Sequence, residues 1–361
     1  MSWPSWLPLR ETLRPMSPYG APQVPAVAAL NTNENPYSPS PALQKAITDA
    51  VAKVAVDLNR YPDRDATILR TKLATYINEG NGTSFTLDNI WAANGSNEII
   101  QSIFLAFAQG AVLGFTPSYS MHPLIAKTTG AQWIDGKRNA DFSLNASDAV
   151  SEIVKNKPSL TFITTPNNPT GGAVTLAEIQ KLADAAKDVG GLLVVDEAYA
   201  EFSQETSAVT LIANNPHLIV IRTMSKAFAF AGARLGYLVS DVAVKDAMMI
   251  VRLPYHLSAL TQAAAQVAID HRAELLSGVS TLIKARGQVV QALHDMGLTT
   301  ITSSANFVLF TGFKQDAPQL WAALLEKGVL IRDVGLSGYL RVTIGNEAEN
   351  KLFVSALKEL I

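Results

Sequence analysis

Short apolar runs alternate with helix-like stretches through the middle of the chain. Runs of strand length cover residues 90–93, 111–115, 160–164, 192–195, 218–221 and 237–239. Apolar residues at helical spacing lie between some of them, over 96–108 and 175–189, and the second stretch opens with the capping pair Thr175 and Glu178. This alternation predicts an α/β fold in which helices cover both faces of a mostly parallel sheet.

The two ends of the chain follow other patterns. Nine of the 18 prolines lie in the first 41 residues, which excludes a long helix or an inner strand there and predicts an extended arm. Ser40 and Pro41 then resemble a helix start. Residues 258–294 read as one long or once-broken helix, with Gly278 as the candidate break, and strand-like and helical stretches alternate after it.

These changes divide the chain into three predicted parts. We predict an N-terminal arm over 1–40 that packs with the small domain, and a large domain over 41–255. A linking helix and a small α+β domain are predicted over 256–361. A chain of 361 residues is long enough for two such cores.

Composition and charge narrow the classes of function. Apolar residues make up 48% and charged residues 17%, which is typical of a globular protein. The formal net charge is -2 without a long basic run, which argues against nucleic acid as a partner. The absence of cysteine excludes thiol nucleophiles and Cys-ligated metals. The N-terminus does not resemble a signal peptide, and no apolar stretch is long enough to span a bilayer, so we expect a cytoplasmic protein without membrane contact.

Polar residues follow several apolar runs, and parallel strands gather such residues at one sheet edge. Lys226 offers an amine, which burial and a cation such as Arg234 would help to keep neutral. Asp196 ends a run that reads as buried on both faces, so its carboxylate needs a partner. An amine, an acid and phosphate donors together are the parts that bind pyridoxal phosphate. The alternatives are a surface or ion-paired lysine and a helix N-cap aspartate.

Other residues near these runs have matching candidate roles. Asn168 lies in a turn fixed by two prolines, and we assign it and Tyr199 to the phenolic oxygen of the cofactor. Tyr119 is a candidate to stack on the ring, with a core tyrosine as the alternative. The predicted helix start at Ser96 would suit a phosphate or be a simple N-cap. The candidate phosphate donors beside that helix are Thr223, Ser225 and Arg234.

Several segments together resemble the fold-type I aminotransferases, and more narrowly the class II histidinol-phosphate aminotransferase subfamily. The matching segments are 30–37, 60–63, 94–98, 117–121, 166–171, 196–199, 222–229 and 340–345. The resemblance implies fold type I, pyridoxal 5'-phosphate as cofactor and a homodimer. It implies Lys226 as the Schiff-base lysine, with Asp196 and Tyr199 also catalytic. The implied cofactor-binding set is Ser96, Asn97, Tyr119, Asn168, Asp196, Tyr199, Thr223, Ser225, Lys226 and Arg234, with Tyr61 reaching the phosphate in the partner's site.

The resemblance also implies a substrate. Members of the subfamily exchange an amino group between histidinol phosphate and 2-oxoglutarate in histidine biosynthesis. The implied substrate-binding residues are Asn168, Arg341 and its helpers Arg332 and Tyr19. His122 departs from the tyrosine that many relatives have there, so it either touches the substrate or is a spacer.

Other functions remain open at this level. An aromatic amino-acid aminotransferase and an O-phosphothreonine decarboxylase use the same cofactor parts. A pyridoxal phosphate-sensing regulator would need a DNA-binding domain, for which the proline-rich arm has no room. A nicotinamide dehydrogenase would need a glycine fingerprint after a strand, and the sequence lacks it.

Overall fold

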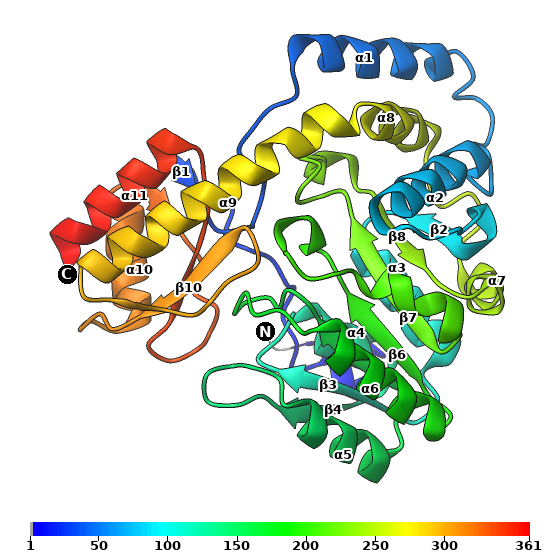
Figure 1. Cartoon of the computed structure of the whole chain (residues 1–361), viewed down its shortest axis with the longest axis horizontal. Helices are drawn as coiled ribbons and strands as arrows, with labels where there is room; N and C mark the ends of the chain where they lie inside the picture. The colour runs from blue at the N-terminus through cyan, green and yellow to red at the C-terminus, as the bar shows by residue number, and fades with distance from the viewer. Residues whose placement is uncertain (1–2) are drawn as a thin grey trace.

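The computed structural model describes residues 3–361. Figure 1 shows a larger part built on one sheet and a smaller part joined to it by the long helix α9 (Arg272–Asp295). Within the described residues, seven strands form the large sheet in the order β2-β8-β7-β6-β5-β3-β4. They are β2 (Ile90–Ala93), β3 (Ala111–Thr116), β4 (Gln132–Lys137), β5 (Leu160–Thr164), β6 (Leu192–Asp196), β7 (Leu218–Thr223) and β8 (Gly236–Val239). In this sheet β8 runs opposite to the other six strands, which are parallel to one another. This confirms the prediction of a mostly parallel sheet.

Helices bury both faces of this sheet. Side chains alternate along each strand, so Leu193 and Val195 join one apolar core while Val194 joins the other. The Val194 core includes α3 (Ser96–Phe107), α4 (Met121–Thr129) and α7 (Val242–Val251). The opposite core includes α2 (Thr67–Asn81), α5 (Ala146–Asn156), α6 (Leu176–Asp188) and α8 (Ala259–Asp270), with α1 (Pro41–Ala55) lying along α8.

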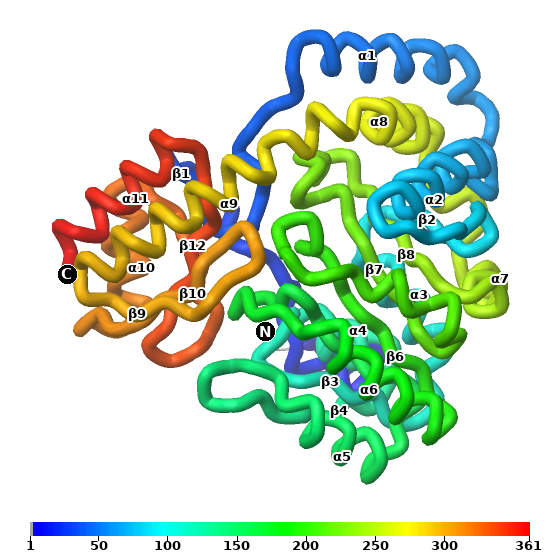
Figure 2. Tube along the Cα trace, viewed as in Figure 1, coloured from blue at the N-terminus to red at the C-terminus, as the bar shows by residue number. Residues whose placement is uncertain are grey.

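A separate core holds the smaller part together. The strands β9 (Thr299–Thr300), β10 (Phe307–Thr311) and β12 (Leu340–Thr343) form an antiparallel sheet, and α10 (Ala317–Glu326) and α11 (Glu347–Leu360) pack with it. The N-terminal arm joins here, because β1 (Ala28–Ala29) pairs in parallel with β11 (Val329–Leu330). Figure 2 shows the arm running between the two parts. The boundaries at 40/41 and 255/256 stay predictions, and the first two residues of the predicted arm lie outside the described residues.

Short 3₁₀ helices complete the chain in its loops. They are η1 (Glu11–Leu13), η2 (Leu87–Asn89), η3 (Ala200–Phe202), η4 (Ala208–Asn214) and η5 (Ala231–Ala233). The predicted helix starts are confirmed. The hydroxyl of Ser40 accepts from the Leu43 N–H at 3.2 Å, and Thr175 and Glu178 form a reciprocal capping box.

The predicted break at Gly278 is wrong. The helical stretch after residue 258 breaks at His271, between α8 and α9, and Gly278 lies inside α9. A Cβ at Gly278 would stand 3.2 Å from the Tyr37 ring, so the glycine allows close packing. The sequence also left β4 unpredicted. This strand lies at the sheet edge, and its exposed residues Gln132, Asp135 and Lys137 interrupt any apolar run.

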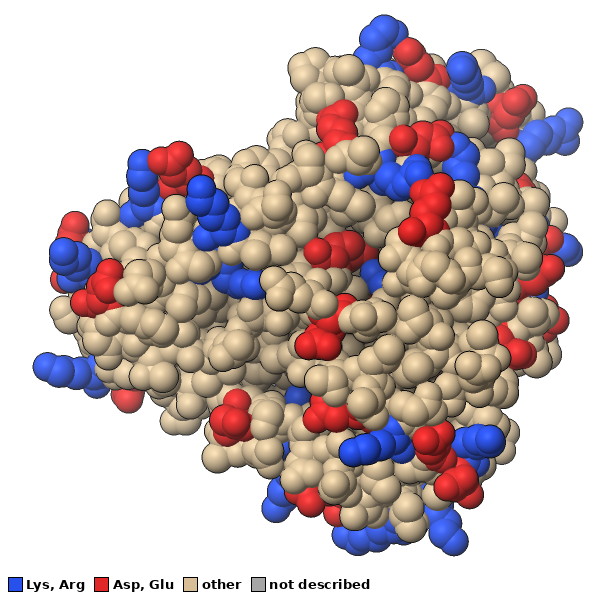
Figure 3. Space-filling model, in the orientation of Figure 1, with Lys and Arg blue, Asp and Glu red and all other residues tan. Residues whose placement is uncertain are grey.

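The surface carries both signs of charge. On the face drawn in Figure 3, basic and acidic residues are interspersed, without a field of one sign. Over the range 3–361, no helix is both long and apolar enough to cross a membrane.

Candidate active site

A cavity of about 570 Å³ lies where the carboxyl ends of the large sheet meet the smaller part. Thr164, Asp196 and Thr223 end β5, β6 and β7, so the parallel strands deliver them to one edge. The predicted residues around this cavity are Tyr19, Ser96, Asn97, Tyr119, Asn168, Asp196, Tyr199, Thr223, Ser225, Lys226, Arg234, Arg332 and Arg341. The structure therefore brings together every residue of the predicted cofactor-binding and substrate-binding sets except Tyr61, which is 79% exposed and lies elsewhere.

Lys226 follows β7 and reaches across the cavity toward the arm. Its Nζ donates to the backbone oxygen of Thr32 at 2.8 Å. Burial is the main cause that lowers the pKa of Lys226 to about 8; Arg341 and Arg234 add to this lowering, and Glu34 opposes it. No ion pair to Lys226 forms in the described part of the chain, so the ion-paired alternative does not hold. A lysine with this pKa is partly neutral near pH 8.

Asp196 is buried at the inner end of the cavity. Its Oδ1 accepts from the Ala198 N–H at 3.2 Å, which makes a turn rather than the start of an α-helix. Its Oδ2 lies 3.4 Å from Nε2 of His122. The ring of His122 is buried against Phe162, with centroids 4.8 Å apart, and is outside the cavity lining. His122 thus contacts the aspartate from behind, a position that neither interpretation of this residue anticipated.

The start of α3 forms a cradle with Arg234. Gly95 is the N-cap of α3, and the Ser96 side chain does not cap it, so the N-cap alternative for Ser96 is wrong. A Cβ at Gly95 would stand 2.5 Å from Nη2 of Arg234, and one at Gly236 would stand 2.5 Å from the Ser96 nitrogen. Glycine is therefore required for the guanidinium and the helix start to approach each other. Thr223 and Ser225 face the same space.

Tyr199 is the centre of a polar cluster on the other side of the cavity. Its hydroxyl accepts from Nδ2 of Asn33 at 2.9 Å and from Nδ2 of Asn168 at 3.4 Å. Burial raises the pKa of Tyr199 to about 12, so the phenol keeps its proton at neutral pH. Oδ1 of Asn168 in turn accepts from Nη1 of Arg341 at 2.5 Å. Asn168 thus links Arg341, the candidate for binding the anionic group of the substrate, to Tyr199.

The remaining candidates surround the mouth and wall. The hydroxyl of Tyr119 donates to Oδ1 of Asn97 at 3.1 Å, and its half-buried ring lines the cavity. Arg341 is buried, with its guanidinium 5.0 Å from the Phe307 ring centroid, and burial lowers its pKa to about 10. Tyr19, which is exposed, and the half-buried Arg332 also line the cavity.

The sequence assigned no role to the segment 31–34, which also lines the cavity. Its backbone oxygens at Asn31 and Thr32 accept from Arg341 and Lys226. The only signal for it was that 30–37 matched the family pattern, because residues in an extended arm show no periodicity that would predict contacts.

Comparison with known proteins identifies the family. The family model described as aminotransferase class I and II matches residues 25–357. The chain belongs to the class I and II aminotransferases. This aminotransferase is 51% identical over 358 residues to the histidinol-phosphate aminotransferase of Mycobacterium sp. strain JLS, covering 98% of this chain and 94% of that protein. It is 52% identical over 357 residues to the protein of the same name from Mycolicibacterium smegmatis, covering 98% and 93%.

A solved structure shares the fold of this aminotransferase. The histidinol-phosphate aminotransferase of Sinorhizobium meliloti, in complex with pyridoxal-5'-phosphate, aligns with a TM-score of 0.84. The alignment covers 98% of this chain and 97% of that chain at 23% identity. The likeness confirms the predicted fold of a class I and II aminotransferase.

Pyridoxal 5'-phosphate is the cofactor of this aminotransferase. The cavity fits it in three respects. Lys226 supplies an amine with a lowered pKa, and Asp196 supplies a buried carboxylate with room for one more partner. The cradle of Gly95, the start of α3 and Arg234 offers N–H donors suited to a phosphate.

Proposed function

We propose that this aminotransferase exchanges an amino group between L-histidinol phosphate and 2-oxoglutarate, a step of histidine biosynthesis. The observation that carries the proposal is the 51–52% identity to histidinol-phosphate aminotransferases over nearly the whole length of both chains. The cavity supports it, because the buried Arg341 and the nearby Arg332 suit an anionic substrate group. A cytoplasmic location remains our expectation.

The candidate residues of the cavity have distinct roles in this proposal. Asp196 would pair with the ring nitrogen of the cofactor, Tyr119 would lie against the ring, and Asn168 and Tyr199 would hold its phenolic oxygen. The phosphate would be held by Ser96, Asn97, Thr223, Ser225 and Arg234. The bound cofactor supplies an electron sink that lowers the barrier to removing a proton from the substrate's α-carbon. Arg341 would orient the substrate by a bidentate contact with its anionic group.

Lys226 would be the base that takes the α-carbon proton. With a pKa of about 8, about a quarter of its amine is neutral at pH 7.5, whereas an ordinary lysine is almost fully charged there. The neutral amine accepts the proton and can return one when the amino group passes to the second substrate. Burial of the amine is thus what makes the lysine usable as a base.

The substrate can be tested by a direct comparison. With 2-oxoglutarate as acceptor, we expect kcat/KM for histidinol phosphate to exceed that for phenylalanine by about 100-fold or more, since phenylalanine carries neither the phosphate nor the imidazole that such a site would hydrogen-bond. Coupled detection of glutamate measures both. An equal or reversed preference would change the proposal to an aromatic aminotransferase. Release of carbon dioxide from O-phosphothreonine would indicate the decarboxylase.

A homodimer is also part of the proposal, because exposed apolar residues gather beside Tyr61. Two neighbouring segments carry them: Val56, Leu58, Tyr61, Ile68, Ile250, Leu253 and Tyr255. The rings of Tyr61 and Tyr255 stack with centroids 4.4 Å apart, so the two segments form one surface. Apolar surface of this kind, with Ile250 at 84% and Leu253 at 72% exposure, is characteristic of an interface. A second copy of the chain would cover it.

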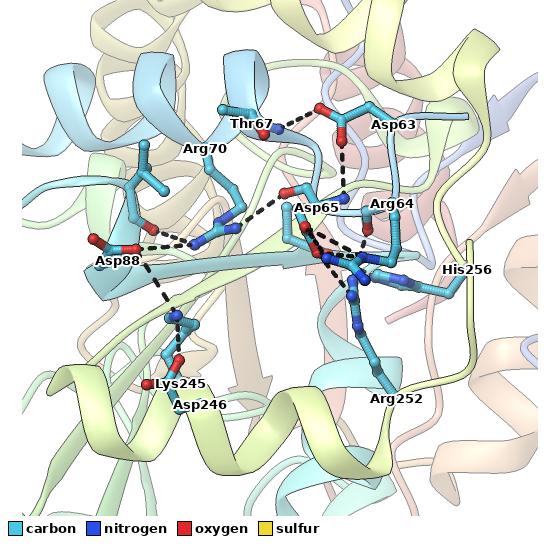
Figure 4. A network of polar contacts seen from close by, with 12 residues as sticks. Asp63, Arg64, Asp65, Thr67, Arg70, Asp88, Lys245, Asp246, Arg252 and His256 are labelled. Atoms are coloured by element: carbon cyan, nitrogen blue, oxygen red, sulfur yellow. Dashed lines mark hydrogen bonds and ion pairs between the residues drawn. The ribbon is translucent and has the colours of Figure 1, made fainter. Parts of the chain in front are cut away.

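The loop that carries Tyr61 is firmly held in the monomer. Figure 4 shows Arg252 reaching the loop from the end of α7. Its Nη2 donates to Oδ1 of Asp65 at 2.8 Å and its Nη1 to the backbone oxygen of Arg64 at 2.6 Å. Arg70 donates to the backbone oxygen of Asp65 at 3.1 Å. A fixed loop can present Tyr61 to a partner at little cost in entropy.

Mixed dimers can test whether Tyr61 acts in the partner's site. We expect Tyr61→Ala and Lys226→Ala each to lower activity, and a mixture of the two variants, exchanged into heterodimers, to regain it. In such a heterodimer one site has an intact Lys226 and an intact Tyr61, so about half of the wild-type activity per heterodimer returns. The assay is kcat after co-refolding or co-expression. A mixture no more active than the sum of the separate variants would place Tyr61 outside the partner's site.

A further inference from the structure

Asn33 is a buried amide whose contacts lead directly into the proposed cofactor site. Its side chain is 2% exposed, and its Nδ2 donates to the hydroxyl of Tyr199 at 2.9 Å. We propose that Asn33 is a positioning residue that sets the direction in which the Tyr199 hydroxyl donates its proton. The inference rests on the proposed role of Tyr199 at the phenolic oxygen of the cofactor.

The first step concerns the hydrogen bonds that the Tyr199 hydroxyl can make. A phenol oxygen can accept two hydrogen bonds and donate one. Asn33 and Asn168 both donate to this oxygen, so its accepting capacity is filled by the two amides. The hydroxyl proton is then left for an acceptor in the cavity. N–H donors to a hydroxyl also strengthen its own donation, because linked hydrogen bonds polarise one another.

The second step concerns the contacts that hold the Asn33 amide in place. Its Oδ1 accepts from the Thr343 hydroxyl at 3.0 Å, and the same hydroxyl accepts from the backbone N–H of Asn33 at 3.0 Å. The backbone oxygen of Asn33 accepts from Nδ2 of Asn306 at 3.1 Å. In this orientation Oδ1 is bonded to the Thr343 hydroxyl and Nδ2 faces Tyr199. The residue is thus held by Thr343 on β12 and by Asn306 in the loop that precedes β10.

The third step concerns the backbone conformation of the arm at Asn33. Asn33 has φ 57°, a left-handed conformation that asparagine tolerates better than most residues. This turn also points the backbone oxygen of Thr32 at Lys226 and that of Asn31 at Arg341. On β12, Arg341 and Thr343 are two residues apart and so share the face that meets the arm. One strand therefore fixes both the substrate arginine and the residue that orients Tyr199.

The test uses Asn33→Gly, since glycine adopts φ 57° without strain and the variant removes only the amide. The protein is loaded with pyridoxal phosphate, and its visible absorbance is recorded as a function of pH. The readouts are the pH at the midpoint of the absorbance change and the Kd for pyridoxal phosphate. Without Asn33, Tyr199 would donate a weaker hydrogen bond to the phenolic oxygen of the cofactor. The anionic form of that oxygen, which prevails at higher pH, would be less stable, so we expect the midpoint of the absorbance change to rise by about 0.5 pH units. The Kd should rise about 2- to 12-fold, the change that corresponds to one net hydrogen bond.

A double-mutant cycle separates positioning from general structure. Tyr199→Phe alone should raise the midpoint more than Asn33→Gly does, and adding Asn33→Gly to Tyr199→Phe should produce no further shift. Thr343→Val, which frees Oδ1 of Asn33 without touching Tyr199, should shift the midpoint in the same direction by less. As a matched control, Asn350→Ala removes another buried amide, bonded to Gly345, and should lower the thermal-unfolding temperature without moving the midpoint.

Other results would contradict either the positioning role of Asn33 or the proposed cofactor roles. A folded Asn33→Gly protein with an unchanged midpoint contradicts the positioning role. So does a shift of equal size in the Tyr199→Phe background, because Asn33 would then act by another route. If Asn33→Gly does not fold, Thr343→Val decides in the same way. A wild-type protein without visible absorbance after loading would overturn the proposed cofactor roles, and the inference with them.

Discussion

Lys226→Ala is expected to abolish transamination, lowering kcat by about 10⁴-fold or more, as when a group that acts together with its neighbours is removed. The variant loses both the amine that bonds the cofactor and the proposed base for the α-carbon proton. The visible absorbance that arises from the bond between the lysine and the cofactor should disappear as well. Absorbance spectra and single-turnover rates with histidinol phosphate measure the two effects.

Two companion variants sharpen this experiment. Lys226→Arg keeps a charged group but cannot supply a neutral amine, so we expect it to be as inactive as alanine. Lys284→Ala removes an exposed lysine of α9 and should leave activity unchanged. Substantial turnover by Lys226→Ala would refute the assignment.

The lowered pKa also gives this lysine a pH signature. The neutral amine is the form that reacts, and its fraction grows as pH rises through about 8. When pyridoxal phosphate is added to cofactor-free protein, the rate of formation of the visible band should therefore rise with pH, reach half its maximum near pH 8 and level off about one pH unit higher. A rate that kept rising toward pH 10.5 would mean that burial does not shift the pKa of Lys226.

Asp196→Asn is expected to lower kcat/KM by about 10²–10³-fold, the cost of losing one well-placed charge in an active site. The amide has the size of the carboxylate but no charge, so it cannot stabilise a protonated ring nitrogen. His122 would then face a neutral group across the 3.4 Å contact. Steady-state rates measured at saturating cofactor separate this effect from weaker cofactor binding.

The control for Asp196 lies on the surface. Asp184→Asn on α6 removes an exposed carboxylate and should change neither kcat nor KM. If Asp196→Asn kept activity within a few-fold of wild type, the carboxylate would have a structural role alone, such as its contact with the Ala198 N–H.

The sequence could predict the parts of the site that depend on local pattern. Apolar runs located the strands, and the rule for parallel sheets then gathered Asp196, Asn168 and Lys226 at one edge. Contacts between distant segments left no such pattern. Asn33 and Thr343 are 310 positions apart, and neither residue type is unusual where it stands. Gly278 read as a breaker because composition alone cannot reveal that the Tyr37 ring packs on it.

His122 is a mixed case. Its position was noticed, but periodicity could not show which face of α4 it occupies relative to Asp196. The answer depends on how α4 packs on the sheet, where the ring contacts both Phe162 and the aspartate. Such tertiary placement is beyond a reading of spacing alone.

The pairing of the N-terminal arm with the end of the chain has a consequence for biosynthesis. The ribosome makes the arm first and β12 close to the end of synthesis. Asn31 and Asn33 therefore cannot form their hydrogen bonds to Arg341 and Thr343 until almost the whole chain has been made. The large sheet can form earlier, because its strands end by residue 239. We therefore expect the cofactor to find its full set of contacts only after nearly the whole chain has been made.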